Sequence, residues 1–367
     1  MNTRLSALAL PMALVVSPAW AYDLNENLSI NLTLAATGQC QSLTNGDAPD
    51  SCRGGLPLQL EGLYRPAKEH ELGLKLGFAA GNGLNTISPF VLLPWAAALE
   101  DDVKHINGRH RNYLLSAWYR YEAQLTADQK LAGTLGILDS TVYLDTNEYA
   151  NDEYTQFMNE VFVNSGIYGL PSYDSGVAAQ WELGDWSLAA VGMNVGENDD
   201  GNSYNFYGAQ LAYKQESGFG PGHYRLILSG TNDRFLDPSG INKNKRFAGG
   251  LSFDQAFGDV IGGFLRFSWQ NEDPLVDYKS LYSGGLNFKG SGWGREADNI
   301  GIGYAYLPGG NSNIDHTQAF ETYYRFGVSD QVSLTFDLQW MQDRYRNQVD
   351  VQDSEGWIFG LRFTAMF

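Results

Sequence analysis

The C-terminal stretch GWIFGLRFTAMF, residues 356–367, alternates between two kinds of side chain. One side of the alternation carries large apolar residues such as Trp357, Phe359 and Phe363. The other side carries small or polar residues and Arg362. A period of two is typical of a β-strand with one apolar face. Because the stretch is about ten residues long, rather than the usual five or six, it predicts a tilted strand that crosses a membrane.

The same alternation recurs upstream, with Tyr, Phe or Trp near the ends of the apolar faces. Aromatic belts of this kind flank the lipid-facing band of membrane barrels, whereas a soluble β-sandwich, the alternative, rarely combines them with such long strands. We therefore predict an all-β fold, a transmembrane antiparallel up-and-down β-barrel. Its sixteen strands lie at residues 27–37, 56–65, 71–80, 111–123, 131–139, 176–184, 185–195, 205–215, 223–231, 247–256, 260–270, 281–290, 298–307, 318–328, 331–341 and 355–367.

Two connections are much longer than a hairpin requires. Residues 81–110 contain an apolar piece, 87–99, that is too short to cross a bilayer. We expect this piece to pack against the barrel or a partner subunit. Residues 140–175 are rich in aromatic side chains, which need a surface to pack on. Since a sixteen-strand barrel has a wide aqueous lumen, we predict that this second loop folds inward and narrows the pore.

The N-terminus has the features of a secretory signal, with Arg4, an apolar stretch from Leu5 to Val16, and small residues at Ala19 and Ala21. We predict a cleaved signal peptide at 1–21 and one barrel domain at 22–367. The formal net charge of −18 argues against a nucleic-acid partner, which would need a basic surface.

The chain has two cysteines, Cys40 and Cys52, and both follow the predicted signal. In an oxidising compartment this pair predicts a disulfide that staples the loop at 38–55. Two cysteines with no nearby histidine supply too few ligands for a metal, so we expect neither a metal site nor a cofactor.

Two stretches resemble a known family. GILDSTVYLDTNEYANDEYTQFMNEVFVN, from Gly136 to Asn164, is similar to the signature of the carbohydrate-selective porins of the OprB type. FETYYRFGVSDQVSLTFDLQW, from Phe320 to Trp340, followed by the C-terminal stretch, looks like that family's last strands. The resemblance implies a porin in the outer membrane of a Gram-negative bacterium, through which small carbohydrates diffuse. It also implies that the loop at 140–175 forms the constriction.

Sugars offer hydroxyl groups and flat C–H faces, so a selective pore needs carboxylates, amides, guanidinium groups and aromatic rings. The candidates in the loop are Asp139, Tyr143, Asp145, Asn147, Asn151, Asp152, Glu153, Gln156 and Asn159. The candidates on the wall are Trp118, Arg120, Glu122, Arg225, Arg266, Arg325 and Arg362. Alternatively, the wall charges only solvate the lumen and pair across strands, and Asp145, Asn147 and Asp152 form hydrogen bonds within the loop. The sequence does not choose between these readings.

Other functions have less support. A barrel hydrolase needs a serine and a histidine on one face, and none of the five histidines has such a partner in the predicted strands. A porin for organic acids or general solutes remains an alternative. Phe367 resembles the terminal signal that the barrel-assembly machinery recognises. The other expected partners are outer-membrane lipids, and the sequence leaves both a monomer and a homotrimer open.

Overall fold

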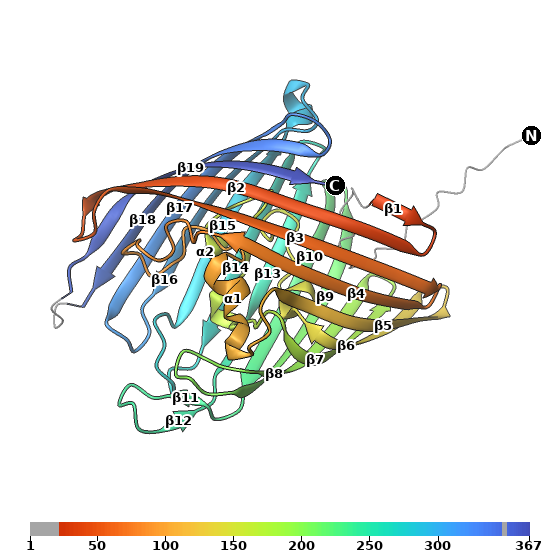
Figure 1. Cartoon of the computed structure of the whole chain (residues 1–367), viewed down its shortest axis with the longest axis horizontal. Helices are drawn as coiled ribbons and strands as arrows, with labels where there is room; N and C mark the ends of the chain where they lie inside the picture. Colours follow the sequence, from red (N-terminus) through yellow and green to blue (C-terminus); the bar gives the residue numbers. More distant parts are fainter. Residues whose placement is uncertain (1–21, 347–350) are drawn as a thin grey trace, which may run out of the picture.

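The computed structural model describes residues 22–346 and 351–367, and the predicted signal at 1–21 lies outside this range. Within it, sixteen long antiparallel strands form one closed barrel, as predicted (Figure 1). They are β2 (Leu28–Asn45), β3 (Ser51–Ala67), β4 (His70–Ala80), β5 (Leu114–Thr126), β6 (Gln129–Leu138), β7 (Asp174–Leu183), β8 (Trp186–Val195), β9 (Tyr204–Ser217), β10 (Gly220–Thr231), β13 (Phe247–Phe257), β14 (Ile261–Gln270), β15 (Ser280–Lys289), β16 (Asn299–Pro308), β17 (Ile314–Gly327), β18 (Val332–Tyr345) and β19 (Ser354–Met366).

Smaller elements lie outside the wall or in the connections. They are β1 (Tyr22–Asn25), which pairs with β2, the two-stranded β11 (Phe235–Leu236) and β12 (Lys243–Asn244), the helices α1 (Glu100–Lys104) and α2 (Glu160–Val163), and 3-10 turns at Ile106–Gly108, Ser140–Val142, Gly166–Tyr168 and Gly290–Trp293. Over the described part of the chain, no helix has both the length and the apolar character needed to cross a membrane.

The barrel closes where its last strand, β19, pairs with its first long strand, β2. The pairing runs from Glu355 opposite Asn45 to Met366 opposite Thr33. The terminal residue extends it, because the Phe367 backbone exchanges two hydrogen bonds with Leu32, at 2.8 and 2.9 Å. Closure gives both edge strands a hydrogen-bonded partner. This is required in a membrane because lipid cannot form hydrogen bonds with backbone N–H and C=O groups.

The two faces of the wall divide as the alternation predicts. On β19, Phe359 is 56% exposed and faces outward, whereas its neighbour Ile358 is fully buried inside. One exception is Leu115, which the simple alternation puts on the outer face. A register shift between β4 and β5 at this point turns Leu115 inward, and it is buried with Val103 and Ile106. A β-bulge of this kind breaks the period of two for one residue.

The Cys40–Cys52 disulfide joins two strands rather than the two ends of a loop. β2 and β3 extend to Asn45 and Ser51, further than the predicted ends at 37 and 56. The two cysteines are therefore opposite one another in the β2–β3 pairing, with Cα atoms 4.0 Å apart. The alternating pattern misses this extension because Gly38, Gly54 and Gly55 supply no apolar side chains.

Short turns and longer connections alternate around the barrel, so they gather at opposite ends (Figure 1). The turns at 68–69, 127–128 and 184–185 mark one end. The connections at 81–113 and 139–173 begin at the other end. In bacterial barrels the longer loops are on the external side.

The lipid-facing band can be tested at Leu361, an outward residue of β19 that is 46% exposed. Leu361→Arg should lower the free energy of unfolding by about 2–4 kcal/mol, the cost of a charge near the middle of a bilayer. Val351 has a similar exposure of 48% but precedes β19 in the connection, so Val351→Arg should change stability by less than about 0.5 kcal/mol. Urea unfolding in lipid vesicles measures both. Equal effects would contradict the placement of Leu361 in lipid.

Candidate functional site

The connection at 139–173 folds into the lumen, where α2 lies inside the ring of strands (Figure 1). Its aromatic side chains bury one another against the inner wall. The ring centroids of Phe157 and Phe162 are 4.9 Å apart, and Phe157 meets Tyr323 edge-on at 5.0 Å. The wall accommodates them with glycine, because a Cβ added at Gly303 would lie only 2.9 Å from the Phe162 ring. Apolar burial therefore draws this loop inward.

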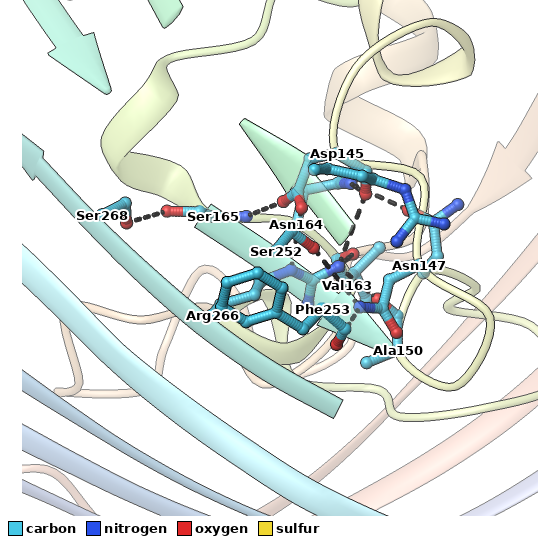
Figure 2. Close-up of polar contacts among 12 residues, drawn as sticks. Asp145, Asn147, Ala150, Val163, Asn164, Ser165, Ser252, Phe253, Arg266 and Ser268 are labelled. Atoms are coloured by element: carbon cyan, nitrogen blue, oxygen red, sulfur yellow. Dashed lines mark hydrogen bonds and ion pairs between the residues drawn. The ribbon is translucent and has the colours of Figure 1, made fainter. Parts of the chain in front are cut away.

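Arg266, on the inner face of β14, binds the loop at several points (Figure 2). Its Nε donates to Asp145 Oδ1 at 2.9 Å, and its Nη1 donates to the carbonyl of Phe162 at 2.8 Å. Its Nη2 donates to the carbonyls of Ala150 and Val163. Arg266 and Asp145 both have no exposed side-chain surface. The planar guanidinium thus supplies donors to backbone carbonyls that would otherwise be buried without partners.

Arg362, on β19, holds a second part of the same loop. It donates to the carbonyls of Glu153 at 2.7 Å and Gln156 at 2.9 Å. Like Arg266, it is fully buried. The sequence makes both arginines candidates for contact with solutes, with solvation of the lumen and pairing across strands as the alternative. The structure places them beneath the loop, where they hold its backbone and are not accessible to a solute.

Glu321, on β17, complements these arginines and was not among the predicted residues. Its carboxylate accepts the backbone N–H groups of Met158, at 2.5 Å, and Asn159, at 3.0 Å. The only sequence signal was its inward position in the alternation of β17. Because local sequence does not show which inward charge the loop will meet, this role could not be inferred without the fold.

The connection at 81–113 also lies inside the barrel, packed on the first loop. The Trp95 side chain is fully buried and its Nε1 donates to the Glu153 carbonyl at 3.1 Å. The Pro94 carbonyl accepts from Gln39 on β2 and Gln339 on β18. The apolar piece predicted at 87–99 therefore packs against the barrel from within, and two loops rather than one occupy the lumen.

Most of the predicted loop residues are engaged by the loop itself or by the wall. The Asn147 amide donates to the carbonyl of Phe253, and the Asn159 amide donates to Gln339. Asp152 accepts from Tyr154 and Thr155 nearby in the loop. The remaining members are also engaged. Asp139 accepts hydrogen bonds from Thr141 and Ser172, and Asn151 accepts one from Asn164. Gln156 accepts from the Asn151 backbone and donates to the Glu148 carbonyl, and Tyr143 is buried against the wall.

The other predicted wall residues are separated around the barrel and mostly paired. Arg120 bonds to Gln180 and to Glu122, whose second partner is Lys130. Arg225 pairs with Asp254 at 2.5 Å. Arg325 donates to Ser333, and Trp118 packs beside the cluster around Tyr143. The predicted wall residues therefore form several pairs rather than one site.

A cavity of about 970 Å3 lies above the two loops, that is, on the side of the barrel where the long connections gather. Its lining includes Asp139, Glu153, Glu160 and Tyr173, together with residues from the connections at 81–113, 196–203 and 271–279. Burial raises the pKa of the Glu153 carboxyl to about 8, and the neighbouring charge of Asp152 adds to the shift. Burial likewise raises the pKa of Glu160 to about 7, against the opposing hydrogen bond from the Leu93 backbone. Both carboxyls can therefore change charge near neutral pH.

A barrel of sixteen strands with an inward loop is the architecture of a porin. The profile of the carbohydrate-selective porin, OprB family, matches residues 102–367, which is most of the chain. The chain belongs to this family. The porin is therefore an outer-membrane channel for small carbohydrates and not an enzyme.

Relatives of this porin agree with the assignment. An uncharacterized protein of Aquifex aeolicus is 32% identical over 279 residues, which cover 74% of this chain and 79% of that protein. The high-pH structure of Pseudomonas putida OprB superposes with a TM-score of 0.74 at 14% identity, over 93% of this chain and 94% of that one. Salmonella typhi OmpF in complex with daunomycin gives a TM-score of 0.55 at 9% identity, over 95% and 100% of the two chains. At such low identities the structural likeness concerns the fold alone.

The role of Arg266 in this porin can be tested with Arg266→Met. The change leaves Asp145 buried and unpaired, which should lower stability by about 3–5 kcal/mol. The loosened loop should also make single-channel currents noisier. Adding Asp145→Asn should recover part of the loss, because it removes the unpaired charge. The control is Arg344→Met, since Arg344 forms part-exposed ion pairs with Asp353 and Glu355 that contribute at most about 1 kcal/mol. Equal losses would argue against a special role for Arg266.

The raised pKa of Glu153 predicts a pH-dependent channel. The carboxyl is mostly neutral below pH 8 and gains its negative charge as the pH rises through about 8. Cation permeability relative to anions should therefore increase between about pH 7 and about pH 9. Glu153→Gln should remove most of this increase above about pH 8, where Glu160 with its pKa of about 7 is already largely charged, and Glu26→Gln, at the opposite end of the barrel, should not. Reversal potentials in planar bilayers measure the permeability ratio at each pH. If Glu153→Gln shows the same dependence on pH as the unmodified porin, the assignment of this dependence to Glu153 is wrong.

Proposed function

We propose that small saccharides enter this porin through the cavity above the two loops and are guided there by polar groups of its lining. The proposal rests chiefly on the cavity, which is about 970 Å3 and is bounded by 81–113 on one side and 139–173 on another. Its lining mixes acceptors such as Glu153 and Asn164 with apolar groups such as Leu93 and Leu170. Carboxylates and amides accept sugar hydroxyls, and apolar groups contact the C–H faces.

Glu153 is the proposed central contact. Its backbone carbonyl is bound by Trp95 and Arg362, which fixes the position of the residue. Its side chain lines the cavity, and no hydrogen bond or ion pair to another residue engages its carboxyl within the described chain. The other predicted carboxylates of the loop accept hydrogen bonds from their own surroundings, as Asp145 and Asp152 do. A sugar hydroxyl could therefore bond to Glu153 without breaking an internal contact.

We also propose how the porin reaches and occupies its membrane. Residues 1–21 would direct export and be removed. The outward apolar band, including Leu265 and Phe336 at 50% and 51% exposure, would contact outer-membrane lipids. Phe367, 51% exposed beside Leu32, would be recognised by the barrel-assembly machinery. Monomer and homotrimer both fit this arrangement.

The test is planar-bilayer conductance with a series of monosaccharides and oligosaccharides as blockers. We expect sugars to reduce the current in a concentration-dependent way. Glu153→Leu should weaken the block about tenfold, the loss of one hydrogen bond to a charged or polar group. Glu153→Gln keeps a carbonyl acceptor of similar size and should retain most of the block. If no sugar reduces the current but organic acids do, the carbohydrate assignment is wrong and the porin is a channel for organic acids.

A further inference from the structure

The cavity above the loops is strongly acidic. Eight carboxyl side chains line it, whereas Arg246 and His105 are its basic side chains among the described residues. Besides Asp139, Glu153 and Glu160 of the inward loop, the acidic set includes Asp101, Glu197, Asp199 and Asp277. They come from four different connections, so the charge surrounds the cavity rather than marking one side of it.

These carboxylates are not in ion pairs within the described part of the chain. Within the described residues, none of the eight lies within 4.0 Å of a basic nitrogen. Where they accept hydrogen bonds, the donors are neutral: the Asn82 amide binds Asp101 at 2.8 Å, and the Leu93 backbone binds Glu160 at 2.8 Å. The carboxylates of the wall differ, since Glu122 and Asp254 are paired with Lys130 and Arg225. Neutral donors stabilise a carboxylate but leave its charge in place.

Arg246 offsets only part of this charge, because it interacts with Asp199 and Asp277 at a distance but forms an ion pair with neither. It lies over the Phe235 ring, 5.5 Å from the centroid, and it donates to the Gln270 side chain at 2.8 Å. Its guanidinium is therefore held at one side of the cavity. Besides Glu153 and Glu160, whose pKa values are raised, the cavity has four carboxyls at exposed positions, Asp101, Glu197, Asp199 and Asp277.

The charge of the lining acts on any solute in the cavity, because the cavity is only about 970 Å3 in volume. Exposed charges act over a Debye length of about 8 Å at physiological salt. A cleft lined by charge of one sign, with a low-dielectric wall behind it, concentrates counter-ions and repels ions of the same sign. A solute in this cavity cannot move beyond the reach of its walls, since both inward loops bound it.

We propose that this cavity sorts saccharides by charge, admitting neutral sugars and amino sugars and excluding sugar acids and phosphorylated sugars. The proposal rests on the proposed route of sugars through this cavity. It concerns repulsion and attraction along a path and implies no bound cation. It also separates this porin from a channel for organic acids, which the same carboxylates would repel.

The test compares two fourfold variants with the same change in charge. Asp101→Asn, Glu197→Gln, Asp199→Asn and Asp277→Asn neutralise the cavity at exposed positions. Asp128→Asn, Asp185→Asn, Asp259→Asn and Asp330→Asn neutralise exposed residues of the short turns at the opposite end. Reversal potentials in a KCl gradient and swelling of liposomes in glucose, glucosamine and glucuronate are measured for each.

The unmodified porin should be cation-selective and should pass glucosamine about tenfold faster than glucuronate, a difference of about 1.4 kcal/mol. The cavity variant should lower this ratio severalfold while glucose passes at its original rate, because it removes four of the eight carboxyls, and the turn variant should keep the original ratio. Glucuronate passing as fast as glucosamine, or an unchanged ratio in the cavity variant, would overturn the proposal. A porin that stays cation-selective but does not pass glucose would instead refute the sugar route and leave the charge effect supported.

Discussion

Lipid offers no hydrogen bonds to a polypeptide backbone, and this constraint governs the rest of the structure. The wall meets it by closing, with β19 paired to β2 along their length. Closure fixes a lumen that sixteen strands make too wide for side chains alone to fill. The same requirement then applies to the two loops that enter the lumen, because their backbones are also buried. Arg266, Arg362 and Glu321 meet it from the wall, with donors and acceptors directed at the loop backbone.

The inner charges of the barrel consequently have two different uses. Those beneath the loops are fully buried and bound to backbone groups, as Arg266 and Arg362 are. Those above the loops are exposed to the cavity and bound, if at all, by neutral donors, as Asp101 and Glu160 are. Burial separates structural charges from those that a solute can meet. A charged residue in a porin wall is therefore informative about transport only when its accessibility is known.

Much of the fold could be predicted from the sequence because a lipid-facing strand leaves a strict period of two. All sixteen strands were predicted near their observed positions, and so was the inward course of the loop after β6. The extensions of β2 and β3 were missed because glycine-rich segments carry no apolar signal, and the alternation fails at Leu115 because a bulge resets the period. The inward path of 81–113 and the buried roles of Arg266 and Arg362 depend on contacts between distant segments, which no local pattern records.

The loop at 139–173 is bound by residues that come much later in the chain. Arg266 lies on β14, and Arg362 lies on the last strand, more than two hundred residues beyond Glu153. Until that strand is in place, the loop has only part of its set of partners. The constriction therefore depends on strands that are distant in the chain, and a barrel that lacked β14 or β19 would lose part of what holds the loop in place.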